Sequence, residues 1–281
     1  MKNIIIVTGG AGFIGSNLIY ELVSQGYEVT SIDDYSAGLK KNEVEGAEYI
    51  NLDIDMVDNL DNNFDICFHL AAKSRVQPSF SDPTEYFRVN VNGTMKIMEW
   101  AKKNNVKVIY AGSSSKHHNP SDSPYAMYKF LGEEVCKLYK NSYSTDVEIA
   151  RFYNVYGPNE SLDEIHGNVI GIWQTKIKKG LPLPIVGDGN QRRDFTHIDD
   201  IVRGCYLAWK KGNQNHYMLG THKSYSILEI AKMFKTKIKY LPRRRGERLG
   251  STIINNNAKK VLGYRSSIDI KNYIKEFIKN N

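Results

Sequence analysis

Cysteine is scarce in this chain, and long apolar runs are absent. Its 281 residues include only three cysteines, Cys67, Cys136 and Cys205, which lie far apart. This odd, scattered set predicts neither a disulfide framework nor a zinc site, and it is typical of a reducing cytoplasm. No run of about 18 apolar residues could span a membrane, and the short apolar run near Met1 is a poor signal peptide. We therefore expect a globular, cytoplasmic protein.

Acidic residues are scarce in the C-terminal part of the chain. Residues 1–150 contain 14 Lys and Arg against 20 Asp and Glu, whereas residues 151–281 contain 24 against 11. A basic surface can bind nucleic acid, an anionic membrane or a phosphorylated small molecule, or it can simply be solvated. No nucleic-acid-binding motif is present, so we expect neither a nucleic acid nor a membrane as a partner. The arginine cluster at 242–248, PRRRGER, favours a phosphorylated ligand.

Strand-like and helix-like segments alternate through the first 155 residues, which predicts an α/β fold. The alternation is typical of a doubly wound parallel sheet, the Rossmann arrangement, with helices on both faces. Glycine- and proline-rich joints beyond residue 155 predict a smaller C-terminal lobe. We expect residues 1–155 and about 191–219 to form the first domain, and about 156–190 and 220–281 the lobe. Expected strands are 4–8, 28–32, 48–52, 65–70, 106–113 and 146–152, and expected helices are 13–25, 82–104 and 124–141.

A glycine-rich loop, VTGGAGFIG, joins the first expected strand to the first helix. Gly9, Gly12 and Gly15 permit a tight turn and let a pyrophosphate approach the backbone beside the positive end of the helix. Asp33 ends the second strand, where a carboxylate accepts hydrogen bonds from a ribose and repels a 2′-phosphate. Unless Asp33 and Asp34 are only turn residues, the pattern predicts NAD rather than NADP as the cofactor.

Further candidate residues follow the carboxyl ends of later strands, where open α/β sheets bind their ligands. Asp53 ends the third strand and could meet an adenine. The fourth strand ends in HLAAKS, in which the small side chains of Ala71 and Ala72 would let a cofactor lie close. Asn90 lies within an expected helix, where a buried polar side chain needs a partner.

Three serines at 113–115 end the fifth strand, and Tyr125 and Lys129 open the next helix. Four residues apart, the tyrosine and lysine share one helical face. A neighbouring ammonium favours the phenolate form of a tyrosine, which can then act as a base. Tyr206 and Lys210 have the same spacing, but no serine cluster precedes them, so we expect a chance match.

Together these features resemble the extended short-chain dehydrogenase/reductase superfamily. The segments AAKSRVQPSFSDPTEYFRVNVNGT, RFYNVYGP, VGDGNQRRDFTHIDD and RRRGERLGSTIINNNAKKVLGY resemble the UDP-glucose and UDP-N-acetylglucosamine 4-epimerases in particular. The resemblance runs from residue 3 to about residue 264. It implies a tightly held NAD, a UDP-sugar substrate, a transient 4-keto sugar and a homodimer.

The resemblance also implies roles for individual residues. Ser115, or next to it Ser114, would act with Tyr125 and Lys129 in catalysis. Ser251 matches a position that walls the sugar, and its small side chain implies tolerance of both UDP-N-acetylglucosamine and UDP-glucose. The expected cofactor-binding residues are Gly9, Gly12, Phe13, Ile14, Gly15, Asp33, Asp53, Ile54, Leu70, Ala71, Ala72, Asn90, Ser113, Tyr125, Lys129 and Tyr153, and the expected substrate residues are Ser114, Ser115, Asn154, Val169, Arg193, Arg244, Glu247 and Ser251.

The chain departs from the family pattern after the serines. Only nine residues separate Ser115 from Tyr125, whereas relatives have about a dozen more. Nine extended residues still span roughly 30 Å, so the two side chains can meet. His117 and His118 could form a metal site with Asp122, but ligands from one short loop rarely complete a metal shell, so no metal is expected.

Three other functions remain open at this stage. A dehydratase of this superfamily would have Asp-Glu after the serine, where this chain has Lys116 and His117. A decarboxylase or a reductase of the same superfamily is a further alternative, and a reductase would need a releasable cofactor. A nucleotide-sugar-binding protein that has lost catalysis is the third.

Overall fold

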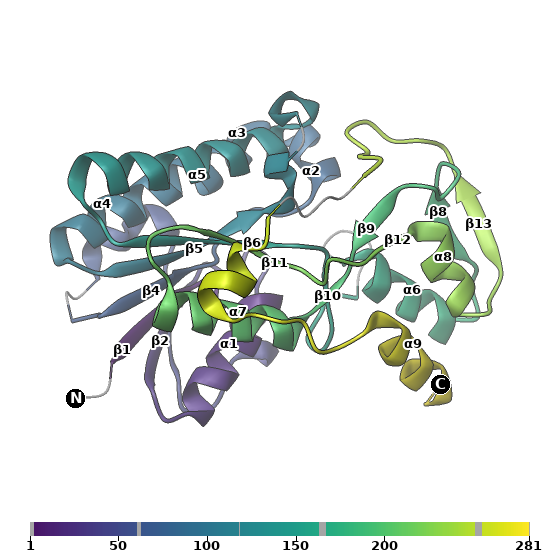
Figure 1. Cartoon of the computed structure of the whole chain (residues 1–281), viewed down its shortest axis with the longest axis horizontal. Coiled ribbons are helices and arrows are strands. Elements are labelled where there is room, and N and C mark those ends of the chain that lie inside the picture. Colours follow the sequence, from purple (N-terminus) through teal and green to yellow (C-terminus); the bar gives the residue numbers. More distant parts are fainter. Residues whose placement is uncertain (1–2, 61–62, 118, 163–166, 251–254, 281) are drawn as a thin grey trace.

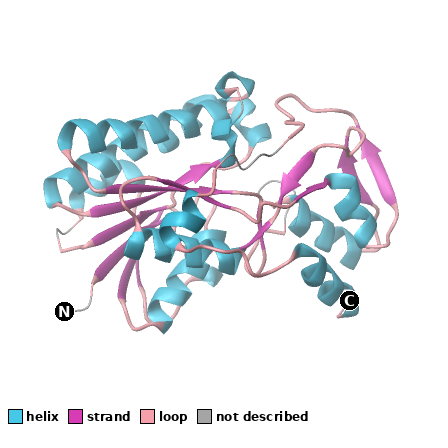
Figure 2. Cartoon of the chain, viewed as in Figure 1, coloured by secondary structure: helices cyan, strands magenta, loops and turns pink. Residues whose placement is uncertain are grey.

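The computed structural model describes residues 3–60, 63–117, 119–162, 167–250 and 255–280. Its larger part is a seven-stranded parallel sheet between two layers of helices (Figures 1 and 2). The strand order is β11-β6-β5-β4-β1-β2-β3, so the direction of winding reverses between β1 and β4. Ligands of such sheets bind at this reversal, beyond the carboxyl ends of the strands. The strands are β1 (Ile4–Thr8), β2 (Glu28–Asp33), β3 (Glu48–Asn51), β4 (Ile66–His69), β5 (Lys107–Ser113), β6 (Val147–Phe152) and β11 (His216–Leu219).

Two apolar cores hold the helices on the sheet. α1 (Phe13–Ser24) and α7 (Ile198–Lys211) cover one face, with Leu18, Ile19 and Ile201 fully buried there. α4 (Thr94–Asn104) and α5 (Pro124–Tyr143) cover the other face. Apart from the partly exposed edge strand β3, the strands are largely buried, as expected for a parallel sheet, and the predicted doubly wound α/β fold is confirmed.

The long helix expected at 82–104 is interrupted near the ligand edge. It begins as α3 (Pro83–Phe87), continues as a π-helical segment, η3 (Arg88–Gly93), and ends as α4. Asn90 lies in this segment. π-Helical turns within α-helices are frequent at functional sites.

A smaller lobe with its own core lies beside the sheet (Figure 1). Trp173 and Phe234 pack edge to face in that core, and Leu183 and Ile230 are fully buried. Residues 255–264 return to the larger part, where Leu262 packs against the sheet. The lobe contains α6 (Val169–Lys178), β8 (Leu183–Val186), β9 (Arg192–Asp194), β12 (Ser224–Ser226), α8 (Ile227–Met233), β13 (Ile238–Leu241) and α9 (Ile270–Lys279). The short elements that connect the others are η1 (Lys40–Asn42), η2 (Ile54–Asn59), α2 (Val76–Ser81), η4 (Ser114–His117), η5 (Pro120–Asp122), β7 (Val155–Tyr156), β10 (Thr196–His197) and η6 (Ala258–Leu262).

Within the described ranges, no helix has the length and apolar character needed to cross a membrane.

Candidate active site

Two adjoining cavities open at the carboxyl edge of the sheet. The smaller, of about 440 Å³, lies over the glycine loop and is called the cofactor cavity below. The larger, of about 780 Å³, lies between the sheet and the lobe and is called the substrate cavity. Their linings overlap in six residues, Arg75, Val76, Asn154, Val155, Asn168 and Arg248, so the two cavities meet at one junction.

The glycine loop forms the floor of the cofactor cavity. Gly9 has a φ of +75°, and a Cβ atom there would lie 2.8 Å from the backbone nitrogen of Ala71. A Cβ atom on Gly15 would lie 2.2 Å from the carbonyl oxygen of Gly9. Side chains at these positions would therefore displace the loop, and bare backbone faces the cavity at the start of α1. This arrangement fits the pyrophosphate of a dinucleotide.

Asp33 lies at the end of β2 and lines the cofactor cavity. Its carboxylate accepts hydrogen bonds from the backbone N–H groups of Ala11 and Tyr35, both at 2.9 Å. Burial raises the pKa of this carboxyl group, and the two N–H donors oppose that shift. The side chain is thus held rigidly at the place where a ribose of NAD would lie.

Asp33→Asn is expected to relax the choice between NAD and NADP. The amide keeps an oxygen that can accept from Ala11 or Tyr35, but it removes the charge that repels a 2′-phosphate. We expect the ratio of NADP to NAD dissociation constants to fall by at least about 10-fold, one charged hydrogen-bonding group being removed. Isothermal titration with both cofactors measures the ratio, and an unchanged ratio would mean that Asp33 is only a turn residue.

Three predicted cofactor residues do not line the cofactor cavity. Both oxygens of Asp53 accept from Arg88, at 2.8 and 3.0 Å, and this pairing lowers the pKa of Asp53. Tyr153 is fully buried and is not part of the cavity lining. Asn90 is also buried, and its amide bonds both the N–H (2.8 Å) and the carbonyl (2.9 Å) of Lys73. Asn90 therefore fixes the cavity wall 70–73 rather than facing the cavity. The predicted residues that do line it are Gly9, Gly12, Phe13, Ile14, Gly15, Asp33, Ile54, Leu70, Ala71, Ala72, Ser113, Tyr125 and Lys129.

A buried histidine, His69, stabilises the same wall of the cofactor cavity through hydrogen bonds. Sequence reasoning did not predict this role. Thr8 Oγ1 accepts from the N–H groups of Leu70 and Ala71, so its own proton is donated to His69 Nδ1 at 2.8 Å. Thr94 donates to the carbonyl of residue 90, and its hydroxyl oxygen accepts from His69 Nε2. His69 is therefore neutral with its proton on Nε2, and burial lowers its pKa to about 3.

The structure brings Ser113 rather than Ser115 to the tyrosine. Ser113 Oγ lies 3.5 Å from the hydroxyl oxygen of Tyr125. Ser115 is 2% exposed, does not line either cavity, and donates its hydroxyl to Ser113 Oγ at 2.9 Å. Ser114 lines the cofactor cavity beside Tyr125. The geometry thus differs from the preference for Ser115, because β5 ends at Ser113 and the η4 turn carries Ser115 behind it.

Lys129 lies one helical turn beyond Tyr125, as the spacing predicted. Its ammonium donates to the carbonyl oxygen of Ala111 at 2.6 Å and lies 4.4 Å from the centre of the Tyr110 ring. Burial lowers the pKa of Lys129 to about 8, and the negative charge of Glu133 on the next turn opposes this. Glu133 itself is paired with Arg151 at 2.8 Å.

The substrate cavity is lined by most of the side chains predicted to bind the UDP group. Arg193 Nη2 lies 3.6 Å from Glu247 Oε2, and burial lowers the pKa of Arg193 to about 10. Asn154 lies at the junction and donates to the carbonyl of Asp194 at 2.9 Å. Ser251 lies outside the described residues, as do His118 and the side chain of His117. Asn154, Val169, Arg193, Arg244 and Glu247 line this cavity.

Arg75 and Arg248, which sequence reasoning did not single out, also line the junction. Arg75 has a φ of +89°, rare for a side-chain-bearing residue, and donates to the side chain of Asn168. Strained backbone of this kind is concentrated at functional sites. The only sequence signal for Arg248 was its place in the arginine cluster.

The sequence and the fold match known proteins over nearly their whole length. Residues 5–220 match the NAD dependent epimerase/dehydratase family. The chain is 30% identical to a UDP-glucose 4-epimerase of Mycolicibacterium smegmatis, covering 98% of each chain. It is 33% identical to a UDP-N-acetyl-alpha-D-glucosaminuronate decarboxylase of Bacillus cytotoxicus, over 82% of this chain and 79% of that protein. The crystal structure of a Thermotoga maritima UDP-glucose 4-epimerase with UDP-glucose superposes with a TM-score of 0.91 at 26% identity, covering 98% of this chain and 97% of that one.

Proposed function

Because the chain belongs to the NAD-dependent epimerase/dehydratase family, whose cofactor is NAD, we propose that it is a UDP-sugar 4-epimerase. The observation that carries this proposal is the junction itself. Tyr125, with Ser113 at 3.5 Å and Lys129 one turn away, lines the cofactor cavity, and Arg75 and Arg248 line both this cavity and the arginine-lined substrate cavity that it meets. When bound, NAD supplies a reversible hydride acceptor at that point.

Tyr125 is the proposed proton acceptor. In its phenolate form it takes the proton of the sugar 4-hydroxyl as C4 becomes a ketone, and it returns the proton when the ketone is reduced. Lys129 favours the phenolate through its positive charge, which the Ala111 carbonyl holds in place. A serine hydroxyl beside Tyr125 orients the sugar oxygen during both steps.

The substrate cavity suits a nucleoside diphosphate. Arg193 and Arg244 offer guanidinium groups that can grip phosphate oxygens in pairs. By the family resemblance, Glu247 would accept a hydrogen bond from the uridine ribose, and Asn154 would contact the sugar and phosphate; both line this cavity. Once O4 has given up its proton and C4 its hydride, a 4-keto sugar held through its diphosphate could turn and be reduced on its other face.

A decarboxylase is the second candidate, since several relatives carry that name. Dehydration is disfavoured, because Lys116 and His117 stand where a dehydratase of the superfamily has its acidic pair. The proposal includes a homodimer, which the family resemblance supports. It also includes a cytoplasmic location, which the three free, buried cysteines support.

Incubation of the protein with single UDP-sugars, followed by NMR of the products, tests the proposed function. The set is UDP-glucose, UDP-galactose and their N-acetylated forms. We expect interconversion of each 4-epimer pair without added cofactor, because NAD is regenerated in each cycle. The small Ser251 side chain supports turnover of both the N-acetylated and the plain pair. Release of CO₂ from a UDP-hexuronate, with no epimer formed, would instead favour the decarboxylase.

Replacing the three serines singly distinguishes their roles. Ser114→Ala is expected to lower kcat by about 10- to 100-fold, because one hydrogen bond to a reacting oxygen is lost. Ser113→Ala is expected to have a similar effect through its contact with Tyr125. Ser115→Ala, whose hydroxyl faces Ser113 and not the cavity, is expected to change kcat less than about 5-fold. Steady-state kinetics measure kcat of the three variants. If Ser115→Ala had the largest effect, Ser115 would be the catalytic serine, as the sequence resemblance favoured.

A further inference from the structure

The substrate cavity has more positive charge than a UDP group needs. Among the described residues, its lining includes Arg75, Arg193, Arg244 and Arg248, against one carboxylate, Glu247. Glu247 is already paired with Arg193. Arg193 and Arg244 line only the substrate cavity, whereas Arg248 also lines the cofactor cavity together with Tyr125.

Backbone contacts on both sides fix the position of Arg248. Arg193 Nη1 donates to the carbonyl oxygen of Arg248 at 2.8 Å, and the N–H of Arg192 donates to that of Leu249 at 2.8 Å. On the other side, Gly246 packs so closely that a Cβ atom there would lie 2.9 Å from Val76. The segment 244–249 thus bridges β9 and α2, and the Arg248 side chain is held at the junction.

The Arg248 guanidinium lacks a partner of its own. Within the described ranges, no hydrogen bond or ion pair joins this group to another residue. Burial lowers the pKa of Arg248, and the nearby Tyr125, Glu247 and Asp122 oppose that shift. A desolvated cation without a direct ion pair is unfavourable, and an anionic ligand group would compensate it.

The place of Arg248 indicates which ligand group that is. If Tyr125 takes the proton at C4, the sugar ring lies at the Tyr125 end of the junction, and the diphosphate extends towards Arg193 and Arg244. The hexose carbon next to C5 is the substituent closest to C4 that can carry an acid. We propose that Arg248 pairs with a carboxylate on the hexose, so that the preferred substrates are UDP-hexuronates. This inference rests on the proposed function for the orientation of the sugar.

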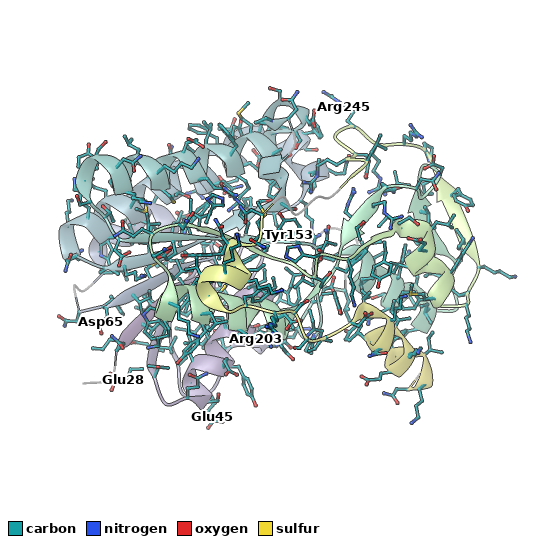
Figure 3. All side chains as sticks on the ribbon, in the orientation of Figure 1. Glu28, Glu45, Asp65, Tyr153, Arg203 and Arg245 are labelled. Atoms are coloured by element: carbon teal, nitrogen blue, oxygen red, sulfur yellow. The ribbon has the colours of Figure 1, made fainter. Side chains whose placement is uncertain are left out.

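Binding and turnover are measured separately to test it. Titration calorimetry on the NAD-loaded protein compares UDP-glucuronate, UDP-glucose and UDP. The variants are Arg248→Gln, which removes the charge, and Arg248→Lys, which keeps it without the planar fork. Arg245→Gln is the matched control, because Arg245 stacks 4.7 Å from the Phe80 ring at the outer edge of the molecule and lines neither cavity (Figure 3).

We expect wild type to bind UDP-glucuronate more tightly than UDP-glucose. Arg248→Gln should weaken the binding of UDP-glucuronate about 10- to 100-fold, because a charge-assisted hydrogen-bonded pair is lost. The affinities for UDP-glucose and UDP should change less than about 3-fold. Arg248→Lys should recover part of the loss, and Arg245→Gln should match wild type.

If Arg248→Gln lost equal affinity for all three ligands, the inference would be overturned, since Arg248 would then bind the diphosphate or stabilise the fold. No preference for UDP-glucuronate in wild type would overturn it as well, and epimerisation of UDP-glucose would then leave the proposed function standing. A binding preference lost in Arg248→Gln supports the inference even if no 4-epimer forms, in which case only the proposed function fails.

Discussion

Replacing Tyr125 by phenylalanine is expected to lower kcat by at least about 10³-fold, with UDP-sugar binding changed less than about 3-fold. The change removes one oxygen atom, which lies 3.5 Å from Ser113 Oγ at the lining of the cofactor cavity. General acid–base catalysis by a positioned side chain contributes about 10²- to 10⁴-fold, and here one group handles the proton in both half-reactions. Steady-state kinetics and calorimetry with the preferred UDP-sugar measure the two quantities.

Tyr206→Phe is the matched control. Tyr206 has a lysine, Lys210, at the same spacing, but it lies on α7, where its hydroxyl is 3.4 Å from that of Tyr27. Neither cavity includes it. Its removal should change kcat less than about 2-fold, as for most substitutions outside special sites. Comparable losses at the two tyrosines would show that Tyr125 acts structurally.

Gly9→Val is expected to reduce bound NAD from about one per chain to less than about a tenth. A side chain at this position meets the backbone of Ala71 at 2.8 to 2.9 Å, and the φ of +75° disfavours any β-branched residue. The loop must then move away from β4, and the pyrophosphate would lose its bare backbone floor. NAD(H) released on denaturing the purified protein measures the content.

Gly250→Val serves as the control, because a Cβ atom at Gly250 has nothing within 4 Å and its φ is not in the left-handed range. This variant should retain NAD at the wild-type level. Binding of UDP to both variants checks that the lobe and its cavity have folded. Full NAD content in a folded Gly9→Val protein would contradict the place given to the glycine loop.

The features that the sequence predicted correctly are those set by local chain geometry. The glycine loop follows a strand and starts a helix, and this local order can be read from the sequence. Tyr125 and Lys129 share a helical face because the α-helix repeats every 3.6 residues. Alternating apolar strands and amphipathic helices have few packed solutions, which is why the parallel sheet was predictable.

Residues whose role depends on a distant partner were not predictable in this way. The preference for Ser115 overlooked a single turn, η4, that places Ser113 and Ser114 at the cavity and Ser115 behind them. Asn90 needed a partner, as the sequence indicated, but only the fold shows that the partner is the backbone of Lys73.

The junction itself is a product of tertiary structure. Arg248 lines the same cavity as Tyr125, although more than a hundred residues of chain separate them, because Arg193 holds its backbone from the lobe and Val76 packs under Gly246 from the sheet side. Sequence alone predicted the strands and helices, the glycine loop and the spacing of the tyrosine–lysine pair, since each of these shows in a local sequence pattern. Which hydroxyl faces the tyrosine, and which cation faces the sugar, depends on contacts between segments that only folding brings together.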